Sequence, residues 1–337
     1  MRVGFNPNRD KYIQKNDFFH QVIIPVYIPN HEGYFRDSFK VLRYCLESLF
    51  RTSHSKTFFT VVNNGSCQDV ADYLEKLKKE NKIQEIVHTT AIGKLNAILK
   101  GLSGHKFDLI TITDADVLFL NNWQKGVYNV FDVFKKAGAV GTTPSSKVLK
   151  HHTSNVIVEN IFSSKLSFTN VLNPEAMKMF ANSIGNDTFY RDVHLRKYLA
   201  ITSKDTKAII GTGHFVVTYR GEIFENLAVK YTSYSLGGDS ESIFLDRPVE
   251  EEGYWRLSTE DNYTYHMGNV FEEWMDNVYN TLVPEVNEVK TSLNLSYKPI
   301  TCFCLPMRLF FRVIKKEPFW KIFLTRKGLT SEEAQNY

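Results

Sequence analysis

An alternation of short apolar runs with longer segments of helical period, starting at His20, constrains the fold more than any other feature of this sequence. The apolar runs occupy residues 21–28, 58–62, 85–88 and 108–113. Between the first two runs, apolar side chains recur at the spacing of a helix at Phe39, Leu42, Leu46 and Leu49. Strands and helices in this order form a parallel sheet whose faces are covered by helices. The sequence therefore predicts an α/β fold with an open, mostly parallel sheet.

The composition is that of a folded domain. Hydrophobic residues make up 43% and charged residues 23% of the 337, and the net charge is +4. These values argue against disorder and give no reason to expect a nucleic-acid partner. Four cysteines are too few for a disulfide framework, which favours a reducing compartment. No stretch has the character of a signal peptide or a membrane span, so we expect a cytoplasmic protein.

Two carboxylates, Asp114 and Asp116, directly follow the fourth apolar run. In extended backbone, residues at i and i+2 point to the same side, and open α/β folds bind ligands at the carboxyl ends of their strands. Mg²⁺ or Mn²⁺ held by such a pair can neutralise phosphate charge. Two other interpretations stay open. The pair could be solvated turn residues, or Asp114 could be the nucleophile of a haloacid-dehalogenase-like phosphatase, although no later Gly-Asp-Gly-x-x-Asp run completes that site.

Six segments follow one another in an order that is typical of one enzyme family. They are VIIPVYIPN (22–30), VVNNGS (61–66), IGKLNAIL (92–99), TDADVLF (113–119), GTGHFVVTYRGEIFENL (211–227) and LGGDSE (236–241). Over roughly residues 20–270 this order resembles glycosyltransferase family 2, whose inverting members have a GT-A nucleotide-binding fold. The resemblance implies a GT-A domain, and we expect a helical C-terminal appendage beyond it.

By this resemblance, the ends of the first strands bind the nucleotide of the donor. The implied donor-binding residues are Pro25, Tyr27, Asn63, Asn64, Lys94 and Asp114. Asn63 stands where the family usually has an acidic residue that accepts a hydrogen bond from the base, so the identity of the base stays open. Taken alone, Asn64 belongs to an ordinary Asn-Gly turn and Lys94 to the solvated start of a helix.

The resemblance also implies a metal site and a catalytic base. Asp114 and Asp116 would hold Mn²⁺ or Mg²⁺ with His266 as a third ligand, and imidazole suits Mn²⁺ better than Mg²⁺. Asp239 falls on the family's catalytic aspartate and would take the proton of the acceptor hydroxyl. Glu241 would replace it if the register differs by two residues. Asp239 could instead cap a helix, and His266 could be structural.

Together these residues imply a hexosyltransferase or N-acetylhexosaminyltransferase. It would move a sugar from a nucleoside diphosphate sugar to a hydroxyl of a glycan or lipid-linked glycan acceptor, with inversion at the anomeric carbon. Three alternatives remain. They are the phosphatase, a retaining glycosyltransferase with the same metal site, and a non-catalytic glycan-binding descendant of the fold.

The last part of the chain is basic and aromatic. Between residues 307 and 327, seven lysines and arginines accompany one acid, Glu317, among Phe, Trp, Leu and Ile side chains. Such a segment can lie on the anionic cytoplasmic face of a membrane, or it can pack its aromatic side chains on the domain.

We therefore expect three regions along the chain. They are an N-terminal extension (1–17), a GT-A catalytic domain (18–282) with a donor half (20–120) and an acceptor half (121–282), and a linker with a basic tail (283–337).

Overall fold

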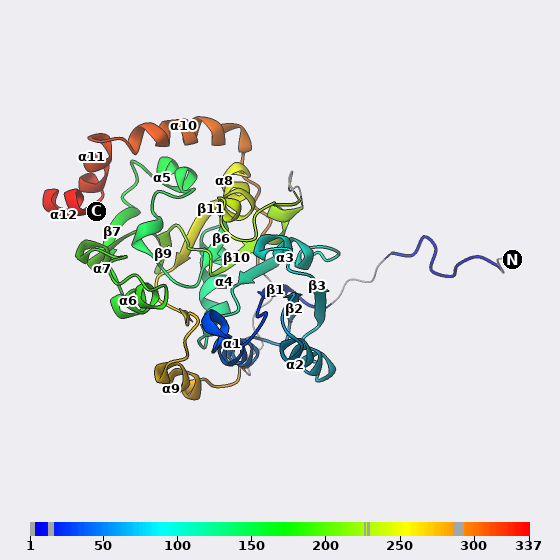
Figure 1. Cartoon of the computed structure of the whole chain (residues 1–337). Helices are drawn as coiled ribbons and strands as arrows, with labels where there is room; N and C mark the ends of the chain where they lie inside the picture. The colour runs from blue at the N-terminus through cyan, green and yellow to red at the C-terminus, as the bar shows by residue number, and fades with distance from the viewer. Residues whose placement is uncertain (1–3, 13–16, 226, 228–229, 286–292) are drawn as a thin grey trace.

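The computed structural model describes residues 4–12, 17–225, 227, 230–285 and 293–337. Figure 1 shows the chain, in which helices surround a central sheet. The strands are β1 (His20–Val26), β2 (Thr57–Asn64), β3 (Glu85–Thr89), β4 (Leu109–Thr113), β5 (Val117–Phe119), β6 (Ala137–Gly141), β7 (Leu166–Asn170), β8 (Lys197–Ser203), β9 (Thr206–Ile210), β10 (Val216–Arg220), β11 (Trp255–Thr259) and β12 (Thr264–His266). The helices are α1 (Ser38–Thr52), α2 (Gln68–Lys79), α3 (Lys94–Gly101), α4 (Trp123–Val133), α5 (Ser154–Glu159), α6 (Pro174–Ser183), α7 (Asp192–Arg196), α8 (Arg247–Glu251), α9 (Glu273–Thr281), α10 (Cys304–Ile314), α11 (Phe319–Arg326) and α12 (Ser331–Asn336).

Ten strands of the described residues form one sheet in the order β3-β2-β1-β4-β10-β6-β11-β9-β8-β7. The first four pair in parallel, as expected for strands that are joined by helices. β10 runs antiparallel between β4 and β6, and β11 is parallel to β6. β9, β8 and β7 follow as antiparallel neighbours. Most of these strands therefore point the same way, which confirms the predicted α/β class.

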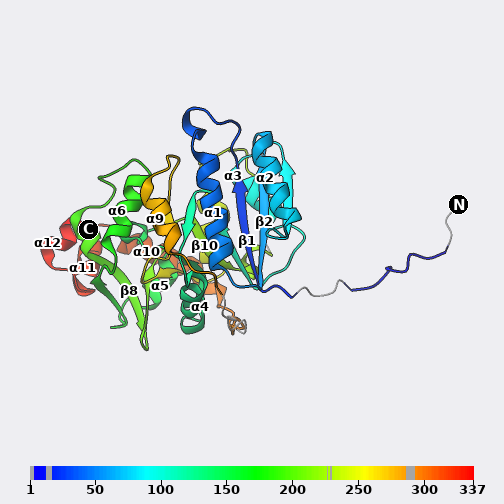
Figure 2. The same ribbon diagram turned by 90° about the horizontal axis from the view of Figure 1, so that it is seen from below.

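β1 is buried on both faces, which explains its continuous apolar sequence. Val22 and Ile24 belong to a core that includes Leu46 of α1. Ile23, on the opposite face, packs in a second core with Ile98 of α3. Figure 2 shows α9 alongside α1, where it extends the first of these layers. The sheet is therefore covered by helices on both faces near β1.

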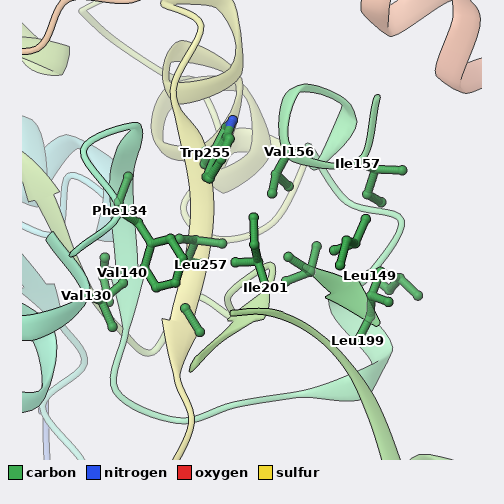
Figure 3. Packing of buried hydrophobic residues seen from close by; sticks show 14 of the residues in the cluster. Val130, Phe134, Val140, Leu149, Val156, Ile157, Leu199, Ile201, Trp255 and Leu257 are labelled. Carbon is green, nitrogen blue, oxygen red and sulfur yellow. The ribbon is translucent and has the colours of Figure 1, made fainter. Parts of the chain in front are cut away.

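A third core lies under the other half of the sheet. Figure 3 shows Val130 of α4, Val140 of β6, Leu257 of β11 and Ile201 of β8 among its side chains. The C-terminal helices join the same core through Phe311, Ile314, Trp320, Phe323, Leu324 and Leu329. The helical appendage is therefore present, and part of its apolar surface is packed on the domain.

The expected geometry of the two aspartates is wrong in one respect. β4 ends at Thr113, and residues 115–116 form a turn, so the backbone between Asp114 and Asp116 is not extended. The turn is needed because β5 must leave the main sheet to pair with β12. The two carboxylates therefore meet through this turn and not through the alternation of a strand.

The remaining observations concern the start of β10, the linker before the tail and the length of the helices. Within the segment of residues 211–227, β10 begins at Val216. Part of the linker expected from residue 283, and parts of the N-terminal extension, lie outside the described residues. Within the described part of the chain, no helix is both long enough and apolar enough to cross a bilayer.

Candidate functional site: two carboxylates and a histidine at the sheet edge

The site begins at the carboxyl end of β4, where the chain turns into the short strand β5. The Asp114 amide donates to the Phe215 carbonyl at 2.8 Å, which ties this end of β4 to the residue before β10. β5 pairs antiparallel with β12, so that His266 is the partner of Val117. The Met267 amide also donates to the Asp116 carbonyl at 2.8 Å. A two-stranded ladder therefore brings a histidine from late in the chain beside the aspartate turn.

Asp114, Asp116 and His266 form a cluster in which one potential ligand atom of each lies within 4.8 Å of the others. His266 Nε2 is 3.4 Å from Asp116 Oδ2. The other ring nitrogen, Nδ1, lies 2.9 Å from the Ser183 hydroxyl of α6, which orients the imidazole with Nε2 toward the aspartates. An outer hydrogen bond of this kind fixes the orientation of metal-binding histidines.

The cluster fits a divalent cation. Asp116 Oδ1 is buried and has no hydrogen-bond partner among the described residues. Burial raises the pKa of Asp116, with the charge of nearby Asp114 acting in the same direction, so these surroundings disfavour its ionised form. A cation removes that penalty. Two carboxylates and one imidazole suit Mn²⁺, and Mg²⁺ is compatible with the carboxylates.

Lys94 lies between this cluster and a second acidic group. Lys94 is the first residue of α3. Its amine is 2.6 Å from Asp114 Oδ1 and 2.8 Å from Glu241 Oε1. Burial opposes the charge of the Lys94 amine, but the two carboxylates outweigh it and raise its pKa. The backbone amide of Lys94 also donates to the Ser235 carbonyl at 3.0 Å, so residues before Glu241 are attached to the start of the helix. Lys94 therefore links the turn after β4 to the LGGDSE segment.

Glu241 begins a chain of charged side chains that ends in the core. Its Oε2 is 3.5 Å from His214 Nδ1, and His214 Nε2 is 2.6 Å from Asp246 Oδ2. Asp246 Oδ1 is in turn 2.6 Å from the guanidinium of Arg256, which is fully buried on β11. Burial would raise the pKa of Glu241, but the charge and hydrogen bond of Lys94, and then the charge of His214, lower it. Glu241 is therefore ionised and held in one orientation from both sides.

Asp239 is placed differently. It is exposed in a turn, with φ at +54°, after two glycines that also have positive φ. Among the described residues its carboxylate makes no hydrogen bond or ion pair, and only its backbone carbonyl accepts, from the Ile243 amide at 2.9 Å. The structure does not bring Asp239 into the network that joins Lys94, Glu241 and His214.

The residues assigned to the nucleotide lie along the same edge, but two of them are occupied by loop contacts. Asn63 Oδ1 accepts from the Ser66 amide at 3.0 Å, and its Nδ2 lies 3.0 Å from His88 Nδ1. Asn64 Oδ1 accepts from the Ile92 amide at 2.9 Å. These buried amides brace the loops that follow β2 and β3.

Pro25 and Tyr27, the other two residues assigned to the nucleotide, remain accessible. Pro25 is half-buried near the end of β1, and Tyr27 is exposed beyond it, with its ring packed edge-on against Phe35. Both lie on the exit of the first strand, next to the Asn63 turn, because β1 and β2 are paired in register there.

Sequence reasoning did not assign His214, Asp246 or Arg256. A signal for Arg256 was present, because a strand of otherwise apolar character, Tyr254-Trp255-Arg256-Leu257, carries one arginine that must find a buried acid. His214 lies within a segment already quoted, but only the fold shows that it faces Glu241 and Asp246.

The sequence matches the profile of glycosyl transferase family 2 over residues 21–194, which is just over half of the chain. The chain belongs to glycosyltransferase family 2. The matched part contains Lys94, Asp114 and Asp116, whereas Glu241 and His266 lie beyond it. The resemblance that the sequence segments implied is therefore confirmed, together with the GT-A type of fold. No curated protein matches the sequence.

Solved structures that resemble this family 2 chain are distant in sequence. TarS of S. aureus is 14% identical with a TM-score of 0.43, and the match covers 77% of this chain and 38% of TarS. GalNAc-T7, solved with UDP, GalNAc and Mn²⁺, is 11% identical with a TM-score of 0.49 over 75% of this chain and 43% of that one. The mannosyltransferase PcManGT from Pyrobaculum calidifontis, solved with GDP-Man and Mn²⁺, is 12% identical with a TM-score of 0.45 over 94% and 86%. The family assignment rests on the sequence profile.

Proposed function

We propose that this chain is a metal-dependent glycosyltransferase that moves a hexosyl or N-acetylhexosaminyl group from a nucleoside diphosphate sugar to a hydroxyl of a glycan or lipid-linked glycan. The observation that carries the proposal is the cluster of Asp114, Asp116 and His266, with one buried and unpartnered oxygen of Asp116. In a family 2 chain, such a cluster at the carboxyl edge of the sheet suits the diphosphate of a donor.

In this proposal each side chain at the edge has a task in donor binding. Asp114, Asp116 and His266 would hold Mn²⁺ or Mg²⁺, which neutralises charge on the diphosphate leaving group. Pro25 and Tyr27, with the turn at Asn63 and Asn64, would contact the nucleoside. The amine of Lys94, already bridging Asp114 and Glu241, would reach the phosphates and add a positive charge.

The transfer itself needs a carboxylate on the acceptor side. As the acceptor oxygen forms its bond to the anomeric carbon, the carboxylate takes the hydroxyl proton, and the bond to the diphosphate oxygen breaks with its electron pair leaving on the nucleoside diphosphate. Attack opposite the leaving group inverts the anomeric configuration. A carboxylate that is ionised at neutral pH can accept that proton.

Glu241 is better supported than Asp239 as this carboxylate. Glu241 is separated from Asp114 only by the amine of Lys94, and His214 holds its other oxygen. Asp239 remains the alternative, as the residue that the family motif aligns with. The two assignments are separated by the variants described in the Discussion.

A donor panel tests the proposal. UDP, GDP, CMP and dTDP sugars are added with Mn²⁺, and the melting temperature is measured, because a ligand that binds only the folded state raises its stability by about 2.7 kcal/mol at 100-fold excess over Kd. One nucleotide should stabilise the protein in the presence of Mn²⁺ only. Asp114→Asn should weaken this effect, and Asp205→Asn, an exposed turn carboxylate between β8 and β9, is the matched control. Absence of any nucleotide effect would argue against the proposal.

The phosphatase alternative predicts a different product. Its Asp114 would form a covalent aspartyl-phosphate, which a fluoride analogue of phosphate can mimic. Asp114 is instead in contact with Lys94 and clustered with a histidine. Stabilisation by the fluoride analogue, lost in Asp114→Asn and accompanied by hydrolysis of phosphate esters, would favour the phosphatase over the transferase. Anomeric analysis of the sugar product separates inversion from retention.

We also propose that the enzyme works on the anionic cytoplasmic face of a membrane, held there by α10 and α11. α10 is apolar on two sides: Phe311 and Ile314 face the core, whereas the opposite side is exposed. The exposed apolar side chains of the two helices are Leu305, Leu309, Phe310, Val313, Phe319 and Ile322. A helix that is apolar on both sides needs a second apolar partner. Figure 1 shows α10 at the periphery of the fold, where such a surface is accessible.

The charge around this surface favours an anionic bilayer over a second copy of the chain. Seven of the residues 307–327 are lysine or arginine and one is glutamate. A symmetric dimer through α10 would bring two such basic surfaces together, which is unfavourable, whereas each basic residue near an anionic lipid surface contributes about 1 kcal/mol.

A further inference from the structure

A basic cavity lies on the side of α10 that faces the domain. It has a volume of about 250 Å³ and lies between α10 and the loop that leads into α5. α10 contributes Arg308, Phe311, Arg312 and Lys315 to its lining, and the remaining lining residues are Lys150, His151, His152, Ser154 and Glu250. The cavity is therefore built from two parts of the chain that are far apart in the sequence.

The one acid in this cavity is already neutralised. Glu250 Oε1 accepts from the Ser154 hydroxyl at 2.6 Å, and Glu250 Oε2 is 2.9 Å from His152 Nδ1 and 3.6 Å from Arg308 Nε. Burial would raise the pKa of Glu250, but the hydrogen bonds from His152 and Ser154, and then the charge of Arg308, lower it to about 2. Glu250 therefore acts as a fixed part of the wall and leaves the other cations of the cavity unpaired.

Three basic side chains in the cavity lack an acidic partner. Lys150, Arg312 and Lys315 make no ion pair with any described carboxylate. The Lys150 amine lies over the Trp320 ring at 4.7 Å and the Lys315 amine over the Phe311 ring at 5.1 Å. Burial, and then the charge of Lys315, lower the pKa of Lys150, while the charge of Glu317 acts in the opposite direction. A bound anion would give these basic side chains the acidic partner that the cavity itself does not supply.

We propose that this cavity binds the phosphoryl group of a membrane lipid. Two ammonium groups and a guanidinium around one concave site match a phosphate, whose oxygens accept several hydrogen bonds. The lipid is favoured as the source of the phosphate because the opposite side of the same helix carries Leu309, Phe310 and Val313, which are exposed and can contact acyl chains. The apolar side of α10 would then contact acyl chains, and the cavity on its other side would take a phosphoryl group at the surface of the same bilayer.

The inference rests on the membrane attachment proposed above but not on sugar transfer, so it can be tested without donor or metal. It also differs from general attraction between a basic tail and an anionic surface. Vesicle binding by general attraction depends on the number of basic residues near the surface. Binding in a cavity depends on which of those residues are present.

The test compares two pairs of substitutions that remove equal charge from the same tail. Arg312→Gln/Lys315→Gln changes the cavity, and Lys316→Gln/Arg326→Gln changes exposed residues outside it. The full-length proteins are mixed with phosphatidylcholine vesicles that contain phosphatidylglycerol, and binding is measured by co-sedimentation. The cavity pair should weaken binding at least about tenfold more than the exposed pair, which loses only its share of surface attraction. Lys150→Gln, on the facing loop, should weaken binding in the same way even if the cavity pair folds poorly.

A second arm identifies the source of the phosphate. Inorganic phosphate, added with a chelator, should raise the melting temperature of the parent and of Leu309→Ser/Phe310→Ser but not that of the cavity pair. Leu309→Ser/Phe310→Ser should nevertheless lose vesicle binding. Suppose that phosphate stabilises the parent, but vesicle affinity falls equally in the cavity pair and the exposed pair. The cavity then takes a soluble phosphate compound, and the lipid assignment is overturned. Equal loss without any phosphate effect would overturn the cavity itself.

Discussion

The parallel half of the sheet and the half beyond β10 hold their functional side chains by different means. On the parallel side, Asp114 and the Asn63 turn lie at the site because their strands end there, and strand direction alone brings them to one edge. On the other side, Glu241 is oriented by Lys94 and His214, and through Asp246 by a buried arginine. The parallel side of the site is therefore defined by topology, and the side beyond β10 by a chain of ion pairs and hydrogen bonds. Single substitutions should affect the two sides differently.

The largest effect should come from the carboxylate at the head of the ion-pair chain. Glu241→Gln keeps the shape of the side chain and removes the base, so turnover should fall by about 10²-fold to 10⁴-fold while donor binding persists. Asp239→Asn is the matched control and should stay within a few-fold of the parent, because Asp239 is exposed and outside the network. Initial rates with saturating donor measure both. A large loss in Asp239→Asn with little loss in Glu241→Gln would reverse the assignment.

The buried end of the same chain should be sensitive in stability. Asp246→Asn leaves the guanidinium of Arg256 without its acid inside the core, and breaking a buried pair in this way costs about 3–5 kcal/mol. Chemical denaturation measures the change. The double variant Asp246→Asn/Arg256→Gln should lose less than the sum of the two single variants. If the losses in unfolding free energy simply add, the two side chains do not act as a pair. The site beyond β10 would then not be held by a chain of ion pairs.

The tail should contribute to the core of the second half. Leu324 is fully buried in the core that the C-terminal helices share with the sheet, so Leu324→Ala should lower the free energy of unfolding by about 2–5 kcal/mol. Ile322 lies on the same helix but is exposed, and Ile322→Ala should change stability by no more than about 0.5 kcal/mol. Equal effects of the two variants would mean that the tail is not packed as described.

A smaller, pH-dependent effect on stability is expected at a buried group of two histidines and a tyrosine beside β1. The Tyr128 hydroxyl of α4 lies 2.7 Å from His20 Nδ1 and 2.8 Å from His54 Nε2. Burial lowers the pKa of His54 to about 4, and burial followed by the charge of His54 lowers that of His20. Between pH 6.5 and 4 the unfolded chain binds a proton at His54 that the folded chain does not.

Stability should therefore fall as the pH is lowered through this range, by up to about 3 kcal/mol from His54. His54→Gln removes this titration, so its unfolding free energy should depend less on pH than that of the parent. Denaturation series at several pH values measure the slope. An unchanged slope would show that His54 is not buried in its neutral form.

The same contrast explains how far the sequence could predict the structure. The strands around residues 21–28, 58–62 and 108–113 could be predicted because each is buried on both faces and is separated from the next by a helix of clear period. β7, β8 and β9 were not predicted, because they form an antiparallel part of the sheet in which β9 pairs with β11, a strand far along the chain.

The candidate site follows the same division. Asp114, Asp116 and Lys94 were assigned from segments whose spacing is local, and His266 was assigned from the resemblance to the family. The contacts of Glu241 with Lys94 and His214 join residues that are distant in sequence, so no spacing rule could predict them. The turn at Asp116 was also missed, because it follows from the pairing of β5 with β12, which lies far along the chain.

Manganese titration tests the central claim, that Asp116 from the parallel half and His266 from β12 complete one metal and donor site. Mn²⁺ affinity is measured in the presence of the nucleoside diphosphate that stabilises the parent, for Asp116→Asn, for Ser183→Ala and for the control Asp205→Asn. Ser183→Ala should weaken binding about 10–100-fold, as loss of an outer hydrogen bond does, and Asp116→Asn should weaken it more. Asp205→Asn should leave it unchanged. Unaltered Mn²⁺ affinity in Asp116→Asn would contradict the account.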